Sequence, residues 1–170
     1  MKKVIILFLF STTIFAQNGI SFAVHQDIKL GLGLDKQHMN DTPTLDIIVT
    51  ANLEGKQFEY YYFAIQPLYE RANLHESKFI RYGFNTIWNF NKLVVPKLTV
   101  GIGLGFSMIE RDYSSCYRTY SATADIRYPI AKNLDLTLKN EWLQRPDLIT
   151  PKLCYNLSFG LTFKPIHLFK

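Results

Sequence analysis

Residues 98 to 108 alternate between large apolar side chains and very small ones, and this alternation limits what the chain can fold into. The large residues are Leu98, Val100, Ile102, Leu104, Phe106 and Met108. Between them stand Thr99, Gly101, Gly103, Gly105 and Ser107. Successive side chains of a β-strand point to opposite sides of a sheet, so a period of two predicts a strand with two unlike faces. The fold then depends on whether the apolar face points inward or outward.

The first sixteen residues form a separate unit. Lys2 and Lys3 precede an apolar run from Val4 to Phe15, and Ala16 is a small residue suited to cleavage. The run is too short to span a hydrocarbon core of ~30 Å as a helix, so residues 1–16 are predicted to be a secretory signal peptide. An uncleaved N-terminal anchor is the alternative. Residues 17–170 are then expected to form one domain.

Composition excludes several classes of protein. Without the two lysines of the signal peptide the formal net charge falls from +5 to about +3 (5 − 2), too little to indicate a nucleic-acid partner. No later segment contains 18 consecutive apolar residues, so no transmembrane helix is expected. With 15% aromatic and 19% charged residues the chain is unlike a disordered one. Export would permit a disulfide between Cys116 and Cys154, whose spacing fits no metal motif.

Eight alternating segments follow the signal peptide, separated by turn-rich breaks. They are residues 19–33, 45–54, 57–69, 78–90, 97–109, 117–129, 134–144 and 152–164. The breaks after the odd-numbered segments are longer and polar, and those after the even-numbered ones are mostly shorter. Long loops at one end and short turns at the other are typical of outer-membrane barrels. A soluble up-and-down barrel can share this feature.

The two faces of these segments decide between the alternatives. One face gathers about forty mostly bulky apolar side chains, whereas the interior of an eight-stranded barrel is only just wide enough to be filled by side chains. These residues fit outside, against lipid. We therefore predict an all-β, eight-stranded antiparallel up-and-down transmembrane β-barrel with paired charges in its lumen. The predicted lumen charge network comprises Asp27, Lys29, Arg81, Asp125, Arg127, Asp135, Lys139 and Glu141.

The turn at residues 131–133 predicts specific charge pairs. Folding the flanking segments onto each other places Arg127 opposite Asp135, and Lys139 near Thr123 and diagonal to Asp125. The small residues between 98 and 108 would leave room for longer lumen neighbours.

The segment 57–69 is apolar on both faces. We assign Phe58, Tyr60, Tyr62 and Ala64 to lipid. Tyr61, Phe63 and Ile65 are then expected in the lumen beside Ile48, Phe79 and Ile87, either as an apolar patch or as a small hydrophobic ligand pocket at the barrel mouth. Aromatic girdles are expected at both membrane interfaces. Their candidates are Tyr60, Tyr62, Tyr82, Trp88, Phe90, Tyr128, Trp142 and Tyr155.

Three stretches resemble known proteins. PKLTVGIGLGF (96–106) resembles the Pro-aromatic-Val-Gly-x-Gly-Leu-Gly pattern that recurs in small outer-membrane β-barrel proteins, with Leu98 at the aromatic position. NLDLTLKNEW (133–142) and YNLSFGLTFKP (155–165) resemble the last hairpin of the same group. The resemblance to this OmpA/OmpX-like group implies eight strands and assembly into the outer membrane of a Gram-negative envelope.

One short stretch is a candidate catalytic group. Lipid A deacylases of the PagL type use a His-x-Ser pair and a carboxylate facing lipid near the outer rim, and His75, Ser77 and Glu76 resemble this set. A His beside a Ser can act as the general base in acyl transfer. Lys78 stands where that family has Asn, and a solvated loop is the competing interpretation.

His25 and Asp27 share one face of the first segment. A carboxylate beside a His can support proton relay, and the alternative is one link of a lumen ion-pair network. His38 and His167 lie in a loop and at the tail, and no group has metal-ligand spacing.

The predicted role is non-enzymatic: an outer-membrane monomer with a structural or surface-interaction role, a lumen plugged by paired charges, and no cofactor or metal. Its expected partners are outer-membrane lipids and an unidentified extracellular partner that meets the long loops, not nucleic acid. Eight strands leave no wide channel, so a pore for large solutes is not expected. The alternatives are a PagL-like lipid A deacylase at the outer leaflet and a soluble secreted barrel that binds a small hydrophobic ligand.

Overall fold

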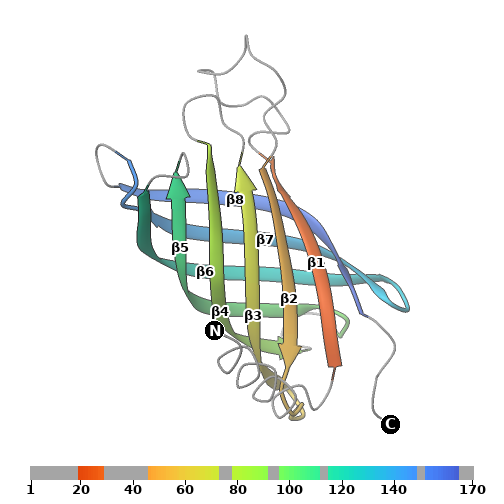
Figure 1. Cartoon of the computed structure of the whole chain (residues 1–170). Coiled ribbons are helices and arrows are strands. Elements are labelled where there is room, and N and C mark those ends of the chain that lie inside the picture. The colour runs from red at the N-terminus through yellow and green to blue at the C-terminus, as the bar shows by residue number, and fades with distance from the viewer. Residues whose placement is uncertain are drawn as a thin grey trace, which may run out of the picture.

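Eight strands close into one antiparallel barrel (Figure 1). The computed structural model describes residues 19–28, 46–72, 78–91, 96–111, 115–148 and 152–164. Each strand pairs with the next one in sequence, and β1 also pairs with β8, which leaves the sheet without an edge. Within the described residues no helix has the length and hydropathy needed to cross a membrane. The strands are β1 (Gly19–Asp27), β2 (Asp46–Glu54), β3 (Tyr61–Ala72), β4 (Phe79–Asn91), β5 (Thr99–Arg111), β6 (Ser115–Ala131), β7 (Leu134–Arg145) and β8 (Lys152–Phe163).

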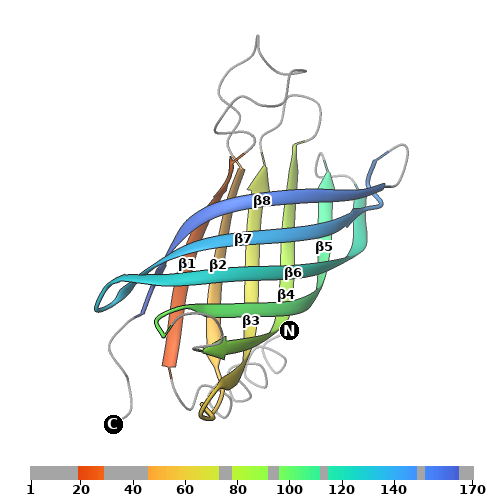
Figure 2. The ribbon, with the colours of Figure 1, turned by 180° about the vertical axis from the view of Figure 1, so that it is seen from behind.

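The two ends of the barrel differ in their connections. Strands β1, β3, β5 and β7 end, and β2, β4, β6 and β8 begin, at the end that we call the loop end; β3 and β5 point toward it at the top of Figure 1, and the connections there span residues 28–45, 73–78, 112–114 and 146–151. Residues 55–60, 92–98 and 132–133 connect them at the opposite turn end, where β1 begins and β8 ends (Figure 2). The predicted difference in length holds for 28–45. It fails for 92–98, which is longer than 112–114.

The barrel is polar inside and apolar outside. Glu70 and Arg81 point inward and are 0% exposed, whereas Leu104 and Trp88 point outward and are 64% and 46% exposed. A water-soluble protein buries its large apolar side chains and exposes its charges. The predicted outward direction of the apolar face is therefore confirmed for seven of the eight strands.

Strand β3 is the exception, and its predicted faces are wrong. Tyr62 and Ala64 are buried in the bore, whereas Tyr61 points outward and Phe63 and Ile65 are only half-buried. The first half of β3 is apolar on both faces, so its sequence does not indicate which face points into the bore. The second half decides: the face of Tyr62 also carries Glu70 within the strand, whereas the opposite face carries a charge only at the loop end, at Arg71, and charged groups are costly in the hydrocarbon region. Ile48, Phe79 and Ile87 are buried, as predicted.

Seven of the eight predicted girdle aromatics lie outside the bore, and Tyr62 is the one that does not. Of the seven, Phe90 is half-buried and the others are exposed. They are Tyr60, Tyr82, Trp88, Phe90, Tyr128, Trp142 and Tyr155.

The small face of β5 lies inside and makes room for its neighbours, as predicted. A Cβ atom at Gly105 would overlap the side chains of Asn85 and Ser121, and one at Gly101 would overlap Asp125. A Cβ atom at Gly103 would overlap the backbone carbonyl oxygen of Thr86.

We predict that Gly103→Val impairs folding, because the backbone of β4 cannot move aside without breaking the sheet. Overpacking of this kind costs about 1–3 kcal/mol. Ala124→Val, which also introduces a valine but at an outward, half-buried position of β6, is the control and should change stability by less than about 0.5 kcal/mol. Urea unfolding of detergent-extracted protein, followed by tryptophan fluorescence, measures both. Equal midpoints for the two variants would contradict the close approach at Gly103.

Candidate functional site

The centre of the bore is organised around one arginine. The Arg81 guanidinium, on β4, donates two hydrogen bonds to the Glu141 carboxylate on β7, at 3.1 Å (Nη1–Oε1) and 2.7 Å (Nη2–Oε2). Its Nε lies 2.5 Å from Oε2 of Glu70, the cross-strand neighbour on β3. Strands β4 and β7 are not adjacent, so this arginine bridges the bore. A fork of this geometry is the strongest form of ion pair between side chains.

A second group of charges lies nearer the turn end. The Arg127 guanidinium donates a hydrogen bond to Oδ1 of Asn89, and its Nε lies 3.6 Å from Oδ2 of Asp125. Lys139 lies opposite Asp125 across the β6–β7 pair, and its Nζ is 3.8 Å from Oε2 of Glu141. These contacts connect the two groups of charges along β7.

The predicted pairing of Arg127 with Asp135 is wrong. Arg127 lies opposite Thr137, and Asp135 lies opposite Pro129. Lys139 is opposite Asp125 rather than near Thr123, which faces Glu141. The register shifts between Pro129 and Ala131, and such a bulge beside the turn cannot be read from an alternating pattern.

Asp135 pairs instead with a residue beyond the last strand. Its Oδ2 lies 2.5 Å from Nζ of Lys164, whose side chain is 44% exposed at the turn end. His25 and Asp27 are both buried on the inner face of β1, as their shared face predicts. Lys29, the remaining member of the predicted network, lies outside the described residues.

An apolar cluster lies inside the bore near its loop end. Ala72, Phe79, Ile109 and Leu143 pack together there and are buried. The Arg145 guanidinium lies 4.1 Å from the centre of the Phe79 ring.

Arg145 also holds the first residues after β7. It donates hydrogen bonds of 2.8 and 2.7 Å to the two carboxylate oxygens of Asp147, and Arg111 donates to the Asp147 backbone oxygen at 3.3 Å. Partial burial would raise the pKa of Asp147, but the hydrogen bonds and charge of Arg145 outweigh it and hold this pKa below its usual value. The Asp147 carboxylate therefore stays ionised and paired at neutral pH.

A row of amides runs along the inner wall of the bore, nearer the turn end than the central arginine. Asn85 donates to Gln66 at 2.9 Å, Gln66 to Asn52 at 2.6 Å, and Asn52 to the Ser21 hydroxyl at 3.1 Å. Ser21 donates in turn to Glu54 at 3.4 Å. Buried polar groups are costly when they lack partners, and this row pairs those of four neighbouring strands.

Two charged residues of the bore fall outside the predicted strand segments. Glu70 and Arg145 start the polar breaks ERANLHES and RPDLITP, whose composition predicts loops. Both lie on strands that run further than the apolar pattern indicates. Glu70 shares a strand face with Gln66, and Arg145 shares one with Glu141. This shared face is the signal that could have placed both residues inside the bore.

The candidate catalytic residues His75, Glu76 and Ser77 lie outside the described residues, as do His38 and His167, so the deacylase stays an alternative hypothesis. Among the described residues no cluster of three or more His, Cys, Asp and Glu side chains is arranged to hold a metal ion. Both cysteines are free: Cys116 is exposed and Cys154 is half-buried.

We predict that Arg81→Met destabilises the barrel by about 3–5 kcal/mol, because it leaves Glu70 and Glu141 buried without their shared cation. Adding Glu70→Gln should recover at least half of the loss, since Glu141 keeps Lys139. Arg118→Met, at an exposed arginine of β6, is the control and should cost less than about 0.5 kcal/mol. Urea midpoints in detergent measure all three. A double variant no more stable than Arg81→Met would contradict the bridge.

The corrected pairing predicts the result of two double-mutant cycles. Arg127→Met combined with Asp125→Asn should show a coupling energy of about 1 kcal/mol or more, and Arg127→Met combined with Asp135→Asn less than about 0.5 kcal/mol. Unfolding free energies of the single and double variants give both values. Coupling confined to the second pair would restore the pairing expected from sequence.

No family model and no curated protein matches this chain. Solved structures do match. The outer membrane protein Ail of Yersinia pestis, in a phospholipid bilayer nanodisc, is 12% identical with a TM-score of 0.56 over 86% of this chain and 99% of that one. Neisserial surface protein A is 12% identical with a TM-score of 0.51 over 85% of this chain and 95% of that one. At such identities the likeness concerns the fold alone, and it confirms the one predicted: an eight-stranded antiparallel transmembrane β-barrel.

Proposed function

We propose that this chain is an outer-membrane protein with a closed bore, exported by residues 1–16, whose role is structural or directed to a partner at the loop end. The observation that carries the proposal is the inverted polarity of the barrel. Charged side chains such as Arg81 and Lys139 are at most 2% exposed, whereas aromatic and aliphatic side chains cover the outside. Backbone groups in a bilayer must be paired within the protein, and a closed barrel pairs them all.

The bore supports a barrier better than a channel. Three layers follow one another along it: the apolar cluster with Arg145 at the loop end, the Arg81 bridge, and the amide row with Arg127. Eight strands enclose only enough space for such side chains. We therefore propose that solutes do not pass, and that the protein acts through its outer surface and its loop end as a monomer.

The polarity of the barrel argues against the soluble carrier. A secreted carrier needs an apolar cavity inside and a polar exterior. Here the inward faces carry buried charges and amides, and side chains such as Phe22, Trp88 and Leu104 would be left in water. An exposed apolar surface of this extent marks contact with a membrane or a partner.

Cell fractionation tests the proposal. The full chain expressed in a Gram-negative host should remain in the outer-membrane fraction after carbonate washing, and the detergent extract should migrate differently with and without boiling. A periplasmic protein released without detergent would overturn the proposal. In planar lipid bilayers the purified barrel should show no steady conductance, and a stable open level would overturn the closed bore alone.

A further inference from the structure

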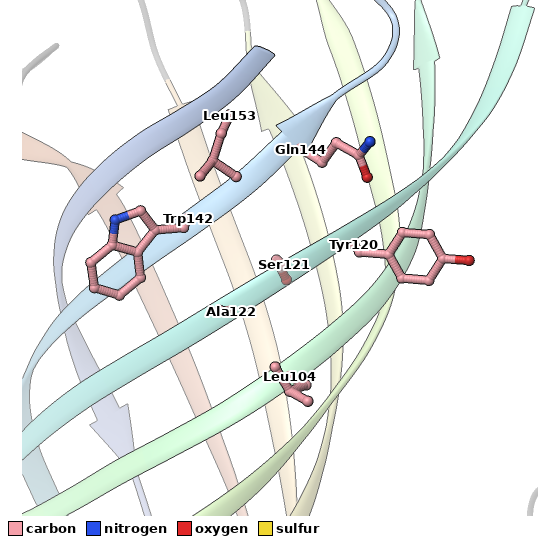
Figure 3. A pocket seen from close by; sticks show the side chains of 7 residues that line it. All are labelled: Leu104, Tyr120, Ser121, Ala122, Trp142, Gln144 and Leu153. Carbon is pink, nitrogen blue, oxygen red and sulfur yellow. The ribbon is translucent and has the colours of Figure 1, made fainter. Parts of the chain in front are cut away.

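The outer face of the barrel carries a groove that nothing in the predicted role requires. It is an open groove over β5 to β8 with a volume of about 700 Å³. Figure 3 shows the side chains around the groove: Leu104 at the bottom of the view, Trp142 on the left, Tyr120 on the right, and Leu153 and Gln144 at the top. Ser121 and Ala122 form the floor.

The groove results from a small residue placed between large ones. Ala122 on β6 is the direct cross-strand neighbour of Leu104 on β5 and of Trp142 on β7. The ring of Tyr155 packs against Trp142 with 5.6 Å between ring centres, which supports that wall from behind. The floor is therefore low and at least one wall is held in place.

The walls stand out further than the rest of the apolar surface. Leu153, Leu104 and Tyr120, at 66%, 64% and 60%, are the three most exposed of the large apolar side chains that the structure describes, and all three line this groove. Elsewhere on the outer face neighbouring side chains cover one another better. Here the gap between them is open to the surroundings.

We propose that this groove holds one acyl chain of a membrane lipid in the leaflet at the loop end. The inference rests on the proposed function, since the groove is continuous with the apolar surface that faces the bilayer. Its lining is mostly apolar, and at the side nearest the loop end Gln144 lies next to Leu153 and offers an amide to the polar part of the lipid.

A chain in the groove gains packing rather than hydrophobic free energy. Inside a bilayer the surrounding lipid is as apolar as the protein, so association depends on van der Waals contact. A chain on a flat part of the barrel touches protein on one side, whereas one over Ala122 touches the floor and two walls. Contacts of this kind are small singly and large together, so this lipid should exchange more slowly than its neighbours.

The two tryptophans allow the groove to be tested directly. Trp142 lines it, and Trp88 lies on β4 away from it. In Trp88→Phe protein, held in detergent and titrated with phosphatidylcholine brominated on one acyl chain, fluorescence of Trp142 should be quenched to saturation. In Trp142→Phe protein, quenching of Trp88 should rise in proportion to the lipid mole fraction. Proportional quenching of Trp142 would overturn the site.

Substitutions locate the saturable quenching. Ala122→Phe fills the floor and should abolish it, whereas Ala51→Phe, the same change at an outward residue of β2, should leave it unchanged. Leu153→Ala lowers one wall and should raise the lipid mole fraction at half-maximal quenching severalfold. This variant keeps the test valid if Ala122→Phe does not fold. Equal effects of Ala122→Phe and Ala51→Phe would overturn the proposal, as would loss of quenching together with chemical cross-linking of two copies through this face.

Vesicles separate this inference from the proposed function. In vesicles made entirely of the brominated lipid, both Trp88 and Trp142 should be quenched because both face the hydrocarbon. If neither is quenched, the membrane location itself fails. If both are quenched but the titration in detergent shows no saturation, the groove alone fails.

Discussion

The narrowness of an eight-stranded bore governs the rest of this structure, because every inward charge must find its partner within the width of two or three side chains. Arg81 meets this condition by reaching two carboxylates on separate walls, Glu70 beside it and Glu141 across the bore. The bridge joins strands that share no backbone hydrogen bonds. It therefore ties opposite walls together through the interior, in a barrel whose diameter is set by the number and stagger of its strands.

The same requirement for partners holds on the outer face, where lipid offers no hydrogen bonds. The Thr86 hydroxyl donates to the backbone oxygen of Leu104 at 3.2 Å, and the Tyr155 hydroxyl donates to Oδ1 of Asn140 at 2.5 Å. Near the loop end Tyr82 donates to Glu110 at 2.9 Å. The hydroxyl groups of these three residues interrupt an apolar surface, but each has a hydrogen-bond partner. This pairing explains how the strands tolerate polar residues on the outer face.

Sequence alternation predicted the strand number, the closed barrel and the outward apolar face, because a volume argument needs only the parity of each segment. It did not predict the faces of β3, where Tyr61 and Tyr62 are equally suited to either side. It also misplaced Glu70 and Arg145, since a polar stretch at a strand end has the same composition as a loop. The partner of Arg127 depended on a register shift near Pro129. Parity is local information, whereas register depends on backbone geometry that spans a turn.

The glycines of β5 show how the interior is shared between its walls. Asn85 and Ser121 occupy volume that a side chain at Gly105 would otherwise take, and Asp125 does the same at Gly101. Side chains on these three consecutive strands thus fill one shared volume, so a larger side chain at one position requires a smaller one at another. In homologous barrels, larger side chains on one of the strands β4, β5 and β6 should consequently be accompanied by smaller ones on the other two. A redesign that enlarges inward side chains on only one of these strands would prevent the barrel from closing.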